Sequence, residues 1–113
     1  MKINQRRKID ELKIKLSEIP KVQLSSFRTP IEALPRVSED LGLEVLVKRE
    51  DINGPAYGGH YTKALEYVFG DIVGKGFDGI VHGGPSHSNQ NRLVVAACAK
   101  YGLQANLVLR KKL

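Results

Sequence analysis

The sequence predicts an α/β fold: a three-layered, parallel-sheet βαβαβ core preceded by two N-terminal helices. Three short apolar segments, at 43–48, 79–82 and 104–109, have the length and composition of buried strands. Two longer segments between them, about 60–74 and 88–101, repeat their apolar residues at helical spacing. Because the connections are short, the strands would follow one another through right-handed parallel crossovers.

The N-terminal segment, residues 1–28, predicts a basic amphipathic helix and a linker. Helical spacing runs over about residues 5–19, and Pro20 ends it. The stripe covers one side of the helix only, so it must pack on the rest of the chain or on a partner. Its members are Ile9, Leu12, Leu16 and Ile19.

Residues 29–113 form the second predicted unit, the α/β domain. A second helix is predicted over about 31–41, with Gly42 as its C-terminal cap. The hydrophobic period then changes, and the first strand, 43–48, follows. The helix at 60–74 has a continuous apolar face, made by Leu65, Val68, Phe69, Ile72 and Val73.

Length and composition exclude several classes of protein. The chain has 113 residues, 42% hydrophobic and 27% charged, which is typical of one globular domain. It has no apolar run long enough to span a membrane, and the N-terminus lacks the apolar stretch of a secretory signal. The single cysteine, Cys98, excludes an internal disulfide and a CxxC metal site. A cytoplasmic protein is therefore expected.

The positive charge does not predict a nucleic-acid-binding protein. The net charge is +6 and the sequence pI about 9.6. Aromatic residues make up only 6% of the chain and are absent from the basic segments, so platforms for base stacking are missing. The basic residues gather at the two ends: Lys2, Arg6, Arg7, Lys8, Lys13, Lys15, Arg110, Lys111 and Lys112.

A ligand site is expected at the carboxyl edge of the sheet. The loop at 50–59 and the turn at 83–87 are rich in glycine and precede helices, so their backbone N–H groups would suit an anion. Alternatively, the glycines only form tight turns. His60, His82 and His87 map to the same edge, but their spacing matches no metal motif, and no metal site is predicted.

Several short motifs follow one another in a specific order over residues 22–113. They are Val-Lys-Arg-Glu-Asp at 47–51, Gly-Gly at 58–59, Leu-Glu-Tyr at 65–67, Gly-Gly at 83–84 and His-Ser-Asn-Gln-Asn-Arg at 87–92. This order resembles the start of fold-type-II, tryptophan-synthase-β-like enzymes that use pyridoxal phosphate (PLP). The branch is that of D-cysteine desulfhydrase and 1-aminocyclopropane-1-carboxylate (ACC) deaminase. The resemblance implies that the loop gripping the PLP phosphate belongs to a later part, absent here.

The resemblance also shows a change at the centre of the site. In that branch, the lysine directly after Gly-Gly-Asn forms the Schiff base with PLP. Here Tyr61 stands at that position and His60 at the asparagine, with unchanged spacing from Gly59 to Leu65. A phenol has no amine and cannot form an imine. Lys63, at the family's arginine position, lies about 200° around the helix from Tyr61 and would point elsewhere.

Other parts of the family's site are kept. By resemblance, Ser88 would hold the substrate carboxylate and Asn89 would contact the 3′ oxygen of the PLP ring. The amides of Gly83 and Gly84 would add to this binding, and Tyr61 would serve as a proton donor or acceptor or stand idle. PLP is therefore expected to bind non-covalently or to be absent from this chain.

Three functions are compatible with these observations. The chain is a small subunit or fragment of a PLP-dependent amino-acid deaminase or desulfhydrase-like enzyme, and is not catalytic alone. Alternatively, it is a non-catalytic binding or regulatory module that uses the ancestral cleft for a protein or a small anionic ligand. The third possibility is a truncated remnant without function. The first two predict a homo-oligomer or a larger partner subunit, and an amino acid or anion as the small ligand.

Overall fold

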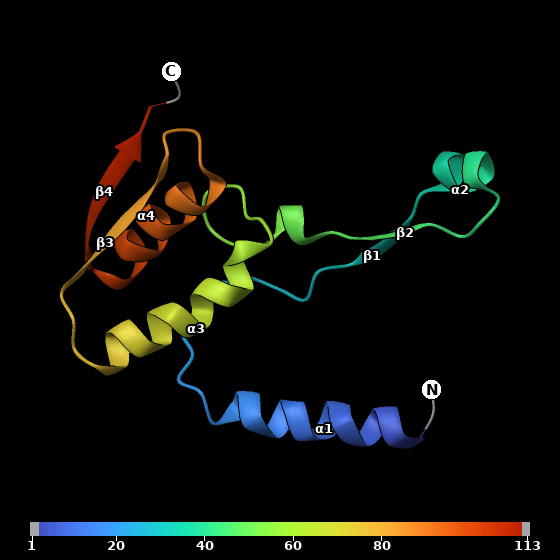
Figure 1. The fold of residues 1–113 in the computed structure, drawn as a ribbon, viewed down its shortest axis with the longest axis horizontal. Helices are drawn as coiled ribbons and strands as arrows, with labels where there is room; N and C mark the ends of the chain where they lie inside the picture. The colour runs from blue at the N-terminus through green and yellow to red at the C-terminus, as the bar shows by residue number, and fades with distance from the viewer. Residues whose placement is uncertain (1–2, 112–113) are drawn as a thin grey trace.

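The computed structural model describes residues 3–111 and has the predicted α/β fold (Figure 1). Helices and a parallel pair of strands form a body, from which the N-terminal helix and a short hairpin extend. Among the described helices, none is both long and apolar enough to cross a membrane. The elements are α1 (Ile3–Ser17), β1 (Ile31–Ala33), α2 (Pro35–Leu41), β2 (Leu46–Lys48), the 3₁₀ turn η1 (Glu50–Ile52), α3 (Tyr61–Gly74), β3 (Gly79–Pro85), α4 (Asn89–Tyr101) and β4 (Gln104–Arg110).

The predicted crossover between the last two strands is confirmed. β3 and β4 pair in parallel, with α4 between them in the chain. One face of this sheet packs with α3 and α4 around the core. On the other face, Val81 is 72% and Val108 66% exposed, so no third layer covers it within residues 3–111. The buried apolar residues are Leu24, Leu65, Phe69, Leu93, Val94, Ala97 and Cys98.

The predicted three-stranded parallel sheet is wrong in its first strand. β2 does not join β3 and β4 but pairs antiparallel with β1. The helix predicted over 31–41 is also shorter, because α2 begins at Pro35. A proline disfavours the helical conformation in the residue before it, and Leu34 has φ −107° and ψ 84°. The helix therefore cannot extend to residues before Pro35, and residues 31–33 pair with β2 instead.

β1, α2 and β2 together form an arm, residues 31–48, that extends away from the body (Figure 1). Gly42 caps α2 in the left-handed conformation, as predicted. None of the seven residues of α2 is buried. At the base of the arm, the backbone N–H of Arg49 donates to the carbonyl of Pro30 at 3.0 Å. The arm is therefore fixed at its base and open at its tip.

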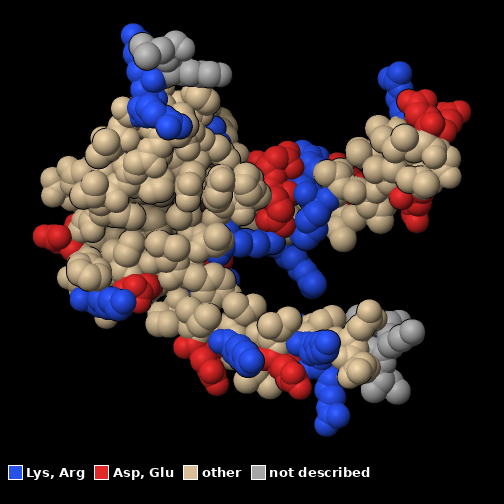
Figure 2. All heavy atoms as spheres, in the orientation of Figure 1, with Lys and Arg blue, Asp and Glu red and all other residues tan. Residues whose placement is uncertain are grey.

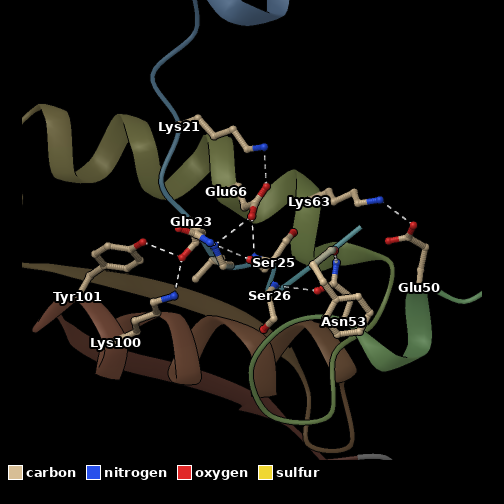
Figure 3. A network of polar contacts seen from close by, with 12 residues as sticks. Lys21, Gln23, Ser25, Ser26, Glu50, Asn53, Lys63, Glu66, Lys100 and Tyr101 are labelled. Atoms are coloured by element: carbon tan, nitrogen blue, oxygen red, sulfur yellow. Dashed lines mark hydrogen bonds and ion pairs between the residues drawn. The ribbon is translucent and has the colours of Figure 1, made fainter. Parts of the chain in front are cut away.

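A linker, residues 18–30, joins α1 to the arm and runs along α3 (Figure 3). Its contacts centre on Glu66 of α3, whose side chain is 2% exposed. Glu66 Oε1 accepts hydrogen bonds from the backbone N–H groups of Leu24, at 3.0 Å, and Ser25, at 2.6 Å. Glu66 Oε2 lies 2.8 Å from Lys21 Nζ. The backbone N–H groups of Leu24 and Ser25 thus find their acceptor within the chain.

Helix α1 contains three of the four residues of the predicted apolar stripe and buries little of them, and Ile19 follows the helix at 47% exposed. Ile9 is 39%, Leu12 58% and Leu16 46% exposed. The helix ends at Ser17, two residues earlier than predicted. Of the basic residues that the sequence places at the chain ends, Lys2 and Lys112 lie outside the described residues.

Candidate functional site

A cleft of about 630 Å³ opens where the arm leaves the body. Figure 2 shows acidic and basic side chains gathered at this junction. The arm, η1, the loop before α3 and the start of α4 all contribute to the cleft. It is lined by Glu32, Leu34, Val47, Lys48, Arg49, Glu50, Asp51, Gly59, His60 and Asn89.

The charged groups of the cleft pair with one another. The Arg49 guanidinium donates to Asp51 at 2.9 Å and to Glu32 at 2.8 Å. These bonds raise the pKa of Arg49 above its ordinary value, and the same guanidinium lowers the pKa of Asp51. Both partners of Arg49 are carboxylates of this chain, so its charge is balanced without a ligand.

Glu50 is the centre of a second group of hydrogen bonds and ion pairs in the cleft. Its Oε1 accepts from Lys63 Nζ at 2.7 Å and from Thr29 Oγ1 at 2.6 Å. These two hydrogen bonds lower the pKa of Glu50. Lys48 lies 3.5 Å from the same oxygen and also donates to the carbonyl and hydroxyl of Thr29. Lys48, which lines the cleft, and Lys63, which does not, are therefore both bonded to groups of this chain.

The glycine-rich loop before α3 is shaped by close packing. Asn53 is fully buried, and its Oδ1 accepts from the N–H of Ser26 at 2.8 Å. A Cβ on Gly58 would lie 2.3 Å from the Asn53 carbonyl oxygen. The N–H of Gly58 donates to Pro55 and that of Gly59 to Glu50. Packing therefore accounts for Gly58, and these two amides are not available to an anion.

Tyr61 is the first residue of α3, and its half-buried side chain packs against the hydrophobic core. The ring of His60 lies beside it, with centroids 4.0 Å apart. His60 lines the cleft, whereas Lys63 reaches Glu50 in the cleft wall. The position that holds a lysine in the resembled branch thus presents a phenol packed on the core. A cofactor bonded to an amine at residue 61 does not fit this site.

Asn89 and Ser88 are neighbours in sequence that open onto different hollows. Asn89 lines the cleft, and its Oδ1 accepts from the Arg92 guanidinium, which also donates to the Gly58 carbonyl at 3.3 Å. A Cβ on Gly59 would lie 2.6 Å from Asn89 Nδ2, so only glycine fits there without displacing the amide.

Ser88 is the N-cap of α4, and its Oγ accepts from the N–H of Asn91 at 3.3 Å. It lines an adjacent hollow of about 440 Å³, bounded largely by residues of α4 and β4. The structure therefore brings His60 and Asn89 to one cleft, and places Ser88 beside it.

The expected turn at Gly83 and Gly84 is wrong, because β3 continues through both to Pro85. They pair opposite Val108 and Leu109 of β4. A Cβ on Gly84 would lie 3.0 Å from Asn91 Oδ1, so close packing against α4 explains this glycine.

The histidines do not share the carboxyl edge as expected. Because the strand is longer than predicted, His82 lies in mid-strand rather than at its end. His87 lies exposed in the turn that follows. Within residues 3–111, no group of three or more histidine, cysteine, aspartate or glutamate side chains could hold a metal ion.

Sequence reasoning missed the paired charges of the cleft. The run Lys48 to Asp51 is a family motif in the sequence, and all four residues line the cleft. Two carboxylates directly after two cations at the end of a strand are a readable signal of local ion pairing. The partner of Glu50, Lys63, is thirteen residues away, and no sequence pattern indicated that contact.

Comparison with known proteins identifies the family. The family described as "Pyridoxal-phosphate dependent enzyme" matches residues 22–113. The chain is 41% identical over 97 residues to a Pyrococcus horikoshii protein named "Putative 1-aminocyclopropane-1-carboxylate deaminase", covering 86% of this chain and 30% of that protein. It is 37% identical over 94 residues to D-cysteine desulfhydrase of Salmonella paratyphi C, covering 83% of this chain and 29% of the enzyme.

A crystal structure supports the same relationship. An ACC deaminase homologue superposes with a TM-score of 0.82 at 41% identity, over 86% of this chain and 30% of the homologue. The chain thus spans less than a third of the length of the proteins it matches, and it aligns with them over most of its own length. The chain belongs to the pyridoxal-phosphate-dependent enzyme family, in the group of ACC deaminase and D-cysteine desulfhydrase homologues.

Proposed function

We propose that this chain is the small subunit or N-terminal fragment of a PLP-dependent amino-acid deaminase or desulfhydrase-like enzyme. In this proposal it forms one wall of the active-site cleft and makes no covalent bond to the cofactor on its own. The observation that carries the proposal is Tyr61, which replaces the amine and packs on the core. The remaining backbone follows that of an ACC deaminase homologue.

The contribution of the chain would be to position polar groups. The Asn89 carboxamide is held at its oxygen by Arg92, and its nitrogen is directed at the cleft residue Gly59. His60 would present a second polar group to the same cleft. Ser88, which caps α4 and lines the hollow beside the cleft, would hold the substrate carboxylate, and a further polypeptide would supply the phosphate loop.

The alternative is a binding module that has lost catalysis and uses the ancestral cleft. The replacement at Tyr61 is compatible with this function as well. The internal pairing of Arg49 and Lys48 argues against a small anion in the cleft, since binding one would require breaking an existing ion pair. A protein ligand is the form of this alternative that the charges permit.

The test is reductive labelling. The chain is incubated with PLP, reduced with borohydride, and the pyridoxyl groups are mapped by mass spectrometry. We expect only scattered, low-level labelling of surface lysines. A stoichiometric adduct on Lys63 would contradict the proposal, because it would show that the amine has moved within α3 and still reaches the cofactor.

Two variants calibrate this experiment. Tyr61→Phe keeps the ring that packs on the core and removes the hydroxyl, so labelling should not change. Tyr61→Lys restores the amine, and we expect a stoichiometric adduct only when another polypeptide completes the site. An adduct and yellow colour in isolated Tyr61→Lys would show that this chain alone holds a complete cofactor site.

A further inference from the structure

Three surfaces carry apolar side chains that nothing within residues 3–111 covers. The first is the α1 stripe, and the second is the open face of β3 and β4, with Val81 and Val108. The third is the arm. Leu34, Val45 and Val47 of the arm are half-buried. Its other five large apolar side chains are between 41% and 63% exposed: Ile31, Val37, Leu41, Leu43 and Leu46.

The amount of uncovered surface is large. A compact protein of 12.5 kDa exposes about 6,200 Å², whereas this chain exposes 8670 Å², an excess of about 2,500 Å². The radius of gyration is 17.7 Å, against about 13 Å for a compact chain of this length. One partner contributes about 800 Å² to an interface of standard size. The excess is about three times that, more than one ordinary dimer contact would cover.

The arm is held in place at its base while its apolar side chains stay open. Arg49 bridges Glu32 on β1 and Asp51 in η1, and Lys48 is bonded to Thr29 of the linker. A helix of seven residues such as α2 is not stable in water by itself. None of its residues is buried within the chain. The ion pairs thus fix the orientation of the arm, and its exposed apolar side chains are available to a binding partner.

The comparison with the solved homologue indicates what that surface belongs to. At a TM-score of 0.82, this backbone corresponds to 30% of a larger folded chain, so the other 70% completes the fold there. Parallel sheets are normally covered on both faces, and the sheet here is covered on one. A second copy of this chain would bring the same 30% again rather than the missing part.

We propose that the arm, the open face of β3 and β4 and the α1 stripe together bind one larger polypeptide, which carries the remaining part of this family's fold. This inference rests on the proposed function, and it adds the surface and the kind of partner. The partner is about twice the length of this chain, as the unmatched 70% of the relative is, and it is held mainly by apolar contacts on these three surfaces.

The experiment is co-expression of this chain with the part of the Pyrococcus horikoshii homologue that lies beyond its matched 97 residues. Size-exclusion chromatography with light scattering measures the mass of the complex. We expect a one-to-one complex. The double variant Leu41→Asp, Leu43→Asp should weaken the affinity at least tenfold. Phe77→Asp, at a side chain 57% exposed in the loop between α3 and β3, is the matched control and should have no effect.

A missing complex would overturn the proposal, provided that the homologue's own N-terminal segment binds the same fragment. A second measurement applies even if that fragment does not fold. In dilute isolated chain, hydrogen exchange should be fast in the arm and slow in β3 and α4. Slow exchange in the arm, or a discrete dimer with the arm protected, would overturn the proposal, because the chain would then cover this surface itself.

Different results would contradict the proposed function and the proposed docking surface. Assembly is measured without cofactor, so a pyridoxyl adduct on Lys63 would overturn the proposed function and leave the docking surface standing. A missing complex would overturn the docking surface alone.

Discussion

The linker and the arm follow one another in the chain, but they differ in how far their side chains and backbone groups find partners within it. The linker, residues 18–30, bonds the N–H groups of Leu24 and Ser25 to the buried carboxylate of Glu66 in α3, and its Gln23 carbonyl accepts from the exposed Lys100 of α4 (Figure 3). The arm, residues 31–48, pairs its own strands but leaves its apolar side chains in water. The comparison separates what this chain stabilises alone from what it offers to a partner.

The contrast has a physical basis in the buried carboxylate of Glu66. Burial alone would raise its pKa, but the ion pair with Lys21 and the N–H groups of Ser25 and Leu24 outweigh this and lower the pKa. A buried charge with this set of partners is costly to disturb, because removing it leaves backbone donors without acceptors. The arm has no comparable buried contact. Changes in the linker network should therefore affect folding, and changes in the arm should affect assembly.

The largest effect should come from removing the linker's acceptor. Glu66→Ala leaves the N–H groups of Leu24 and Ser25 unsatisfied and should lower the free energy of unfolding by about 3 kcal/mol. Glu66→Gln keeps an acceptor oxygen and should cost about 1 kcal/mol. Urea denaturation measures both, and exposed Glu18→Ala is the control. If Glu66→Ala matched Glu18→Ala, the linker network would not be a source of stability.

The next effect concerns how closely the linker approaches α3. A Cβ at Gly70 would lie 2.2 Å from the Pro20 carbonyl oxygen, so Gly70→Ala should destabilise by about 1–3 kcal/mol through overpacking. Gly74, at the end of the same helix, has no atom within 4 Å of such a Cβ. Gly74→Ala should therefore stabilise by about 0.5 kcal/mol through helix propensity. Thermal denaturation measures both variants, and the melting temperature should fall for Gly70→Ala and rise for Gly74→Ala. Equal shifts would show that the linker does not approach α3 closely at Gly70.

A smaller effect is expected from acid. Because the pKa of Glu66 is lowered by folding from its ordinary value of 4.5, its contribution is present above that value. The contribution should be lost as the pH falls from 4.5 through the folded-state pKa, where the carboxylate gains a proton. Urea midpoints measured against pH should fall more steeply for the native chain than for Glu66→Gln in this window. Parallel curves would show that other carboxylates cause the acid sensitivity.

The smallest effect on folding should come from the arm. Leu41 and Leu43 are 60% and 62% exposed, so Leu41→Asp and Leu43→Asp should change the free energy of unfolding of the isolated chain by less than about 0.5 kcal/mol. The same changes should weaken the complex with the larger polypeptide. Destabilisation of the isolated chain by several kcal/mol would remove the distinction between the two regions, because it would mean that the arm packs on this chain.

Several features were predictable from the sequence because they depend on neighbours a few residues apart. The helix α3, the cap at Gly42 and the parallel crossover from β3 through α4 to β4 follow from the period and from cap residues. The predicted apolar face of α3 is correct at Leu65 and Phe69 but wrong at Val68 and Val73, which are exposed. The family also follows from motif order, and the proposal that the Schiff-base amine is lost rests on the identity of residue 61. Pro35 carried a signal that was not used, since it marks where α2 must begin.

The tertiary structure decided what depends on distant contacts. The local pattern of β2 does not reveal that it pairs with β1 rather than β3, because strand pairing joins segments far apart in sequence. The pattern around Tyr61 does not reveal that its ring packs on the core. The ion pair between Lys63 and Glu50 likewise exists only once η1 lies beside α3. The sequence by itself thus determined most of the helices and strands and their order, with β1 as the exception. Three-dimensional packing decided which strands pair, which side chains reach the cleft and which apolar surfaces stay open, because those outcomes depend on how the elements fit together.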